Sequence, residues 1–291
     1  MLTLLLSLAL VAKPSTPFRF PVTASETLTV TIAGEGVAVV LIPGLAGSAF
    51  AFRRLTPILV AGGHRVIIIE PLGMGTSSRP EKADYTLEAQ AGRIAAVLDT
   101  LGIGKATVLG HALGGSIALR LVLARPDLVS ELVLVEGGAA EQAATPGFRR
   151  AMVFVPWIKM MGGGALVRRQ LRKSLAKSSA DPAWITDEVL DGYSRGVTKN
   201  LDATLRGYLR IAEARDRNAL GPRLGQVHVP VLLVLGAAPH EGGPSAEEVE
   251  RLSAGLRFFS LQRVGRAGHH IHEERPCELA ALIESFVAPR P

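Results

Sequence analysis

The chain has 291 residues, of which 48% are hydrophobic and 20% charged, and its mean hydropathy is +0.29. This composition excludes a disordered protein, because it supplies enough apolar side chains for a large buried core. A single cysteine, Cys277, excludes an internal disulfide, and we expect it as a buried thiol in a helix over residues 277–287. No combination of Cys, His and acidic residues has the spacing typical of a zinc site, so we expect neither a metal nor a cofactor.

The net charge of +6 would ordinarily suggest nucleic acid as a partner. The positive excess is confined to residues 137–229, which contain 15 Lys or Arg and 8 Asp or Glu. Only two Trp and three Tyr are available for base stacking, so we expect no nucleic-acid binding. Within this region, residues 149–177 carry eight basic residues and no acid beside apolar side chains such as Val167, Leu171 and Leu175. This pattern is typical of peripheral contact with an anionic membrane, or of a cap helix with a solvated basic side.

The N-terminus carries an apolar run from Leu2 to Ala12, followed by Lys13 and Pro14. Eleven residues are too few to span a bilayer as a helix, but they match the hydrophobic region of a signal peptide. We therefore expect export or membrane tethering through residues 2–12. The alternative is an N-terminal strand or a wrongly assigned start in a cytoplasmic protein.

Short apolar stretches alternate with helical periodicity along most of the chain. Buried strands of this kind, with helices between them, predict an α/β fold with a mostly parallel central sheet covered on both faces. The expected strands are residues 38–43, 65–70, 106–110, 132–135, 229–235 and 257–261, and the expected helices are residues 86–102, 113–124 and 277–287.

Residues 137–229 interrupt this alternation, since they contain several helical stretches, a glycine run at 162–164 and no convincing strand. We interpret them as a helical cap, or lid, inserted into the core. The predicted organisation is a lead-in over residues 1–27, the first part of the core over 28–136, the cap over 137–229 and the second part of the core over 230–291.

The segment Gly110-His111-Ala112-Leu113-Gly114 lies between a predicted strand and a predicted helix. The pattern Gly-x-nucleophile-x-Gly at such a junction is typical of a nucleophile elbow, where small flanking residues permit a strained turn. Ala112 occupies the nucleophile position, and its methyl group can form neither an acyl-enzyme nor a proton-transfer pair.

Over residues 28–291 the chain resembles the α/β-hydrolase family. Besides the elbow, three segments carry the resemblance: residues 43–48 look like the oxyanion loop, residues 70–77 are similar to the family's Asp-x-x-Gly-x-Gly-x-Ser turn, and residues 268–276 look like the catalytic-histidine segment. The resemblance implies an oxyanion hole formed by the backbone N–H groups of Leu45 and Leu113, with His269 as general base. We expect His270 and His272 to lie at the surface or to face the cap, and His111 to pack or form a hydrogen bond.

The acid that would orient His269 is ambiguous. The resemblance places an Asp where this chain has Pro239, which cannot orient an imidazole. Glu136, after the strand that follows the elbow helix, is the first candidate, and Glu241 is the weaker one. A third possibility is that no acid is present.

Three interpretations of Ala112 follow. The first is an esterase-like pseudoenzyme whose pocket binds a hydrophobic ester, lactone or acyl-type ligand without ordinary serine-hydrolase activity. The second is a non-covalent enzyme with His269 as general base. The third is an engineered Ser-to-Ala variant of an active esterase-like or lipase-like hydrolase.

Overall fold

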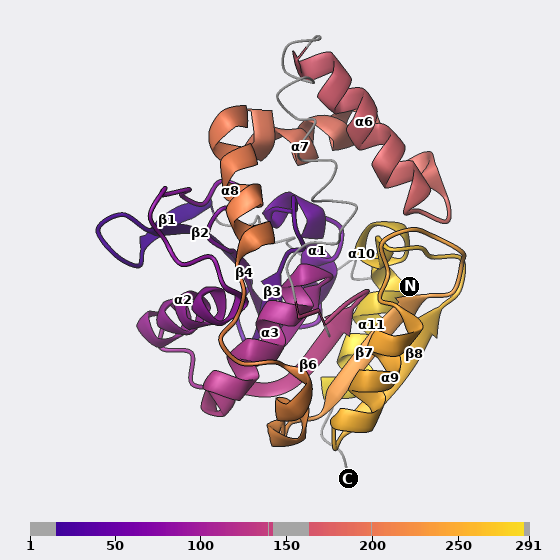
Figure 1. Cartoon of the computed structure of the whole chain (residues 1–291). Helices are drawn as coiled ribbons and strands as arrows, with labels where there is room; N and C mark the ends of the chain where they lie inside the picture. Colours follow the sequence, from indigo (N-terminus) through magenta and orange to yellow (C-terminus); the bar gives the residue numbers. More distant parts are fainter. Residues whose placement is uncertain (1–15, 139, 142–162, 199, 288–291) are drawn as a thin grey trace, which may run out of the picture.

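The computed structural model describes residues 16–138, 140–141, 163–198 and 200–287. Its centre is an eight-stranded sheet in the order β1-β2-β4-β3-β5-β6-β7-β8 (Figure 1). β1 pairs antiparallel with β2, and β2 with β4, whereas all other neighbouring strands are parallel. The strands are β1 (Phe18–Pro21), β2 (Thr27–Ala33), β3 (Val37–Ile42), β4 (His64–Glu70), β5 (Ala106–His111), β6 (Val129–Val135), β7 (Val231–Gly236) and β8 (Phe259–Val264).

Helices bury both faces of this sheet. Along β3, Val40 and Ile42 belong to one hydrophobic cluster and Val39 and Leu41 to another, because successive side chains of a strand point to opposite faces. The first cluster includes residues of α2 (Leu87–Thr100), α3 (Leu113–Ala124) and α9 (Ala246–Gly255). The second includes residues of α1 (Thr56–Ala61), α10 (Ile271–Glu274) and α11 (Pro276–Val287). This arrangement confirms the predicted fold class.

The described helices of the predicted cap lie between β6 and β7 and gather at one end of the molecule (Figure 1). They are α6 (Gly163–Lys177), the 3-10 turn η3 (Pro182–Trp184), α7 (Asp187–Thr198) and α8 (Leu201–Glu213). α7 packs against Phe50, which belongs to the 3-10 turn η1 (Ala49–Phe52). The contact is made at Gly192 of α7, where a Cβ would overlap the Phe50 ring. The predicted cap therefore lies directly beside the predicted oxyanion loop.

The face of α6 that carries Leu171 and Leu175 packs against other cap residues, including Trp184 and Leu190. Arg168 and Arg172 on the same helix pair with acidic residues of α7. This geometry favours the interpretation of α6 as a cap helix. None of the helices in the described ranges combines the length and apolar character needed to cross a bilayer. The apolar run at residues 2–12 and residues 142–162 of the predicted cap lie outside the described residues.

Two sequence expectations need correction. The predicted elements omitted β1 and β2, although both pair with the sheet. Cys277 is exposed rather than buried, because α11 turns Leu279, Ala280 and Ile283 inward and leaves its second residue on the solvent side.

Candidate active site

Ala112 forms a strained turn between β5 and α3, with φ 48° and ψ −114°. Such angles are unfavourable for a residue with a Cβ, so the surrounding backbone must impose them. A Cβ on Gly110 would overlap Gly114, and one on Gly114 would overlap the carbonyl of Ile42. A Cβ on Gly137 would lie 2.6 Å from the Ala112 carbonyl oxygen. The turn therefore has nucleophile-elbow geometry, although its side chain is a methyl group.

The predicted oxyanion loop lies against this turn. A Cβ on Gly44 would be 3.2 Å from the Cβ of Ala112, so the backbone leading to Leu45 passes next to the elbow. Gly47 N–H donates to the Gly44 carbonyl at 2.9 Å, and Ala46 has a positive φ of 65°, which makes the loop a tight turn. Leu113 is the first residue of α3, where a backbone N–H has no partner within its own helix. The two predicted donor residues thus come from the two segments that meet at Ala112.

Glu70, at the end of β4, connects the oxyanion side of the site to the following glycine-rich turn. Its carboxylate accepts hydrogen bonds from the Ala49 N–H at 2.9 Å and from the Thr76 N–H at 2.6 Å. A Cβ on Gly75 would overlap this carboxylate, which explains the glycine at that position. Glu70 therefore acts as a structural tie between the segments at residues 43–49 and 70–77.

His269 lies in the loop between β8 and α10, and residues 178–180 of the predicted cap hold this loop. The His269 N–H donates to the Ser178 carbonyl at 2.8 Å. Glu274 accepts from the Gly268 N–H at 3.0 Å and from the Ala180 N–H at 2.8 Å, so one carboxylate bridges the histidine loop and the cap. The position of the candidate base consequently depends on the cap as well as on the sheet.

Glu136 is the carboxylate beside His269. Its Oε2 lies 3.6 Å from His269 Nδ1, which is within ion-pair range but longer than a hydrogen bond. Its Oε1 accepts from the Gly236 N–H at 2.5 Å. Burial raises the pKa of Glu136, but contacts with His269, the Gly236 N–H and His240 outweigh burial and hold that pKa below its usual value. Glu136 is therefore a fully buried carboxylate beside the histidine, with its pKa held below the usual value.

His240 is a second partner of Glu136, and no motif in the sequence predicted this histidine. Its Nε2 lies 2.8 Å from Glu136 Oε2, and its Nδ1 lies 2.7 Å from the Ala238 carbonyl oxygen. Burial lowers the pKa of His240, but these two contacts raise it more, leaving it above the usual value. Glu241, the weaker candidate acid, instead pairs with Lys177 at 3.2 Å, and its side chain is 69% exposed. One Glu136 oxygen is thus shared between His269 and His240.

His111, His270 and His272 form a buried group of imidazoles close to His269. Burial lowers the pKa of His111 to about 3 and lowers the pKa values of His270 and His272 well below the usual range. The prediction that His111 forms a hydrogen bond agrees with its contact to the His269 carbonyl at 3.1 Å. His270 contacts the cap at Ser178, whereas His272 is 1% exposed and lies among core residues rather than at the surface.

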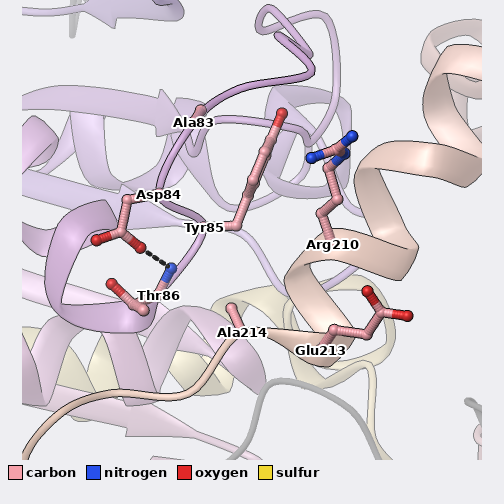
Figure 2. Close-up of a pocket in the computed structure, with 7 residues that line it drawn as sticks. All are labelled: Ala83, Asp84, Tyr85, Thr86, Arg210, Glu213 and Ala214. Atoms are coloured by element: carbon pink, nitrogen blue, oxygen red, sulfur yellow. Dashed lines mark hydrogen bonds between the residues drawn. The ribbon is translucent and has the colours of Figure 1, made fainter.

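Two cavities are formed by the described residues, and neither includes Ala112 in its lining. One of about 670 Å³ borders Glu136 and His240 on the side of α9. Another of about 290 Å³ lies between the loop before α2 and the cap helix α8, where Tyr85 and Arg210 point to the same side (Figure 2). Neither is lined by Leu45 or Leu113.

An elbow, an oxyanion loop and a pair such as His269–Glu136 on a mostly parallel sheet are together typical of the α/β-hydrolase fold. A family model described as the alpha/beta hydrolase fold matches residues 37–276, and the chain belongs to that family. The 2-hydroxy-6-oxononadienedioate/2-hydroxy-6-oxononatrienedioate hydrolase of Paraburkholderia xenovorans is 27% identical over 275 residues, covering 88% of this chain and 89% of that protein. The sn-1-specific diacylglycerol lipase ABHD11 of Mus musculus is 28% identical over 262 residues, covering 86% and 81%. The crystal structure of Cfl2 from Burkholderia cenocepacia superposes with a TM-score of 0.78 at 25% identity, covering 93% and 95%.

Proposed function

We propose that this chain binds a hydrophobic ester, lactone or acyl-type ligand at its elbow and does not process that ligand through an acyl-enzyme. The observation that carries the proposal is Ala112, a methyl group held in the strained geometry of a nucleophile. No lone pair is available at that position to attack a carbonyl. Loss of the nucleophile in serine hydrolases leaves only the residual rate due to the oxyanion hole and binding.

The surroundings of Ala112 support the ligand class. The oxyanion donors are backbone groups, so they persist whatever side chain stands at the elbow. Beside the oxyanion loop, Phe50, Val189 and Tyr193 form an apolar cluster between η1 and the cap, with Phe50 and Tyr193 in edge-to-face contact at 5.7 Å. Two relatives are named for an oxo compound and for diacylglycerol. Both compounds contain carbonyl groups, which is consistent with a carbonyl-bearing ligand.

A second candidate function is a non-covalent enzyme in which His269 acts as general base. The position of Glu136 favours it, because a buried carboxylate 3.6 Å from Nδ1 can orient the ring. The other ring nitrogen, Nε2, is then free to accept a proton from a substrate or from water. An engineered Ser-to-Ala variant of an active hydrolase would have the same geometry, since only the nucleophile is then missing.

Ala112→Ser tests the proposal directly. We expect it to confer hydrolysis of short p-nitrophenyl esters with burst kinetics, at least about 1,000-fold faster than the unsubstituted chain, because the new hydroxyl would supply the one group that the proposed base, acid and oxyanion donors lack. Ala112→Ser combined with His269→Gln is the matched control and should lose this gain. A folded Ala112→Ser chain without esterase activity would show that the site is not hydrolase-like.

Two measurements on the unsubstituted chain distinguish ligand binding from turnover. A thermal-shift screen with lactones, fatty acids and esters should raise the Tm for the correct ligand class. Mass spectrometry of the same mixtures should detect no product. If the unsubstituted chain forms product and His269→Gln does not, the function is that of a non-covalent enzyme and the proposal of binding without turnover is wrong.

A further inference from the structure

Three imidazoles from two segments far apart in the chain converge beside the elbow. His111 is the last residue of β5, His270 precedes α10, and His272 lies within α10. One ring nitrogen of each lies within 4.8 Å of the others. The three residues are between 1% and 9% exposed, so the group is almost entirely shielded from solvent.

Existing hydrogen bonds leave a lone pair free on two of the rings. The His269 carbonyl can only accept, so His111 Nε2 carries the proton in that 3.1 Å contact and Nδ1 keeps its lone pair. Ser178 Oγ donates to the Ser174 carbonyl at 2.8 Å, so it accepts from His270 Nε2 at 3.2 Å. His270 Nδ1 is buried and has no hydrogen-bond partner among the described residues.

His272 is the strongest sign of a ligand. Both of its ring nitrogens are buried without a hydrogen-bond partner among the described residues. A buried polar atom without a partner costs about 1–3 kcal/mol, so two on one ring require an explanation. Arg53, whose charge acts on His272, is paired with Glu273, so the group is not beside an unbalanced positive charge.

We propose that His111, His270 and His272 form a binding site for a borderline divalent transition-metal ion, with Zn²⁺ as the best-suited ion. Three neutral imidazoles are an established ligand set for zinc, and the ring N–H groups of His111 and His270 already donate to outer acceptors, as in many metal sites. Zn–N bonds of about 2.0–2.1 Å in a tetrahedral site bring the nitrogens to about 3.4 Å apart, so binding requires modest ring rotation.

A second group, Glu136, His240 and His269, also places three potential ligand atoms within 4.8 Å. It is a poorer site, because Glu136 and His240 already satisfy one another at 2.8 Å. A Cβ on Gly243 would lie 2.8 Å from Glu136 Oε2, so the loop also leaves little room there. The experiment must therefore distinguish the two groups.

Zinc content and affinity of the full chain test the proposal. After loading with Zn²⁺ and dialysis, we expect one zinc ion per chain by elemental analysis. Competition with a chromophoric chelator should show His272→Gln and His270→Gln weakened at least about 100-fold, more than the loss of an outer partner usually causes. His240→Gln should retain the affinity, as should His228→Gln, which alters an exposed histidine.

X-ray absorption of the zinc-loaded, unsubstituted chain gives a readout that does not depend on the stability of a variant. We expect nitrogen ligands at about 2.0–2.1 Å with a histidine scattering pattern. Absence of bound zinc, or zinc retained in a folded His272→Gln chain and lost in His240→Gln, would overturn the assignment.

Discussion

The backbone at Ala112 is held against its own preference. A non-glycine residue at φ 48° and ψ −114° costs about 1–3 kcal/mol, and here no hydroxyl benefits from the turn. Ala112→Gly should therefore raise the free energy of unfolding by about 1 kcal/mol, after the extra flexibility of glycine in the unfolded chain is subtracted. Urea denaturation of both chains measures the difference.

Ala96→Gly is the matched control for that substitution. Ala96 lies inside α2, where the same loss of a methyl group should lower stability by about 0.5–1 kcal/mol. Equal destabilisation by both substitutions would show that the elbow is not strained.

The contact between His240 and Glu136 predicts a stability that depends on pH. The pKa of His240 is raised on folding, so its contribution is complete below about pH 6.5 and is lost as the pH rises through the folded value. The pKa of Glu136 is lowered, so its contribution is present above about pH 4.5 and is lost as the pH falls. His240→Gln should therefore cost about 1 kcal/mol near pH 6 and less at pH 9. Denaturation curves at the two pH values measure this loss of stability. A loss that is the same at both would contradict a charged pair.

Among the secondary-structure elements, one buried ion pair connects α3 to the end of the cap. Arg120 Nε lies 2.7 Å from Asp216 Oδ2, and both side chains are almost fully buried. Asp216 also accepts from the Glu88 N–H at the start of α2. Asp216→Asn should lower the free energy of unfolding by about 3 kcal/mol, because it leaves the buried Arg120 charge with only the more distant Glu141, 3.8 Å away, as a carboxylate partner.

Asp99→Asn supplies the comparison, since Asp99 pairs with Arg125 on the surface. Its loss should leave the denaturation midpoint unchanged within error, because exposed pairs are screened by water and salt. Similar midpoints for the two variants would mean that the buried pair does not link the elements.

The sequence predicted the elements that carry a strong apolar signal and missed those that do not. β3 to β7 are short apolar runs, so periodicity and punctuation locate them to within a few residues. β2 alternates threonine with apolar residues and β1 is only four residues long, so neither exceeds the signal of an ordinary loop.

The candidate site divides in the same way. Ala112, Leu45, Leu113 and His269 lie in motifs that are local in sequence, whereas His240 reaches Glu136 across 104 positions and has no motif. The histidine group that suggests a metal site likewise needs His111, which lies 159 positions before His270. Spacing along the chain cannot detect donors that only the fold brings together.

At the scale of the whole molecule, the sheet is protected unequally. All six residues of β7 are buried, while β8 at the edge exposes four of its six residues. Hydrogen exchange should therefore be slowest in β3, β5, β6 and β7, and at least about tenfold faster in β8, because amide protection follows the free energy of local opening. Mass spectrometry of peptides from β7 and β8 makes the comparison. Equal protection would imply that an additional layer covers the edge.

The glycines around Ala112 also determine how easily a mutation could return a nucleophile to the elbow. Gly110, Gly114 and Gly137 impose the turn by their backbone contacts, so its geometry does not depend on what side chain Ala112 carries. Every alanine codon becomes a serine codon by changing its first base. A gene for this chain is thus a single nucleotide substitution away from placing a hydroxyl in a turn that is already shaped for it.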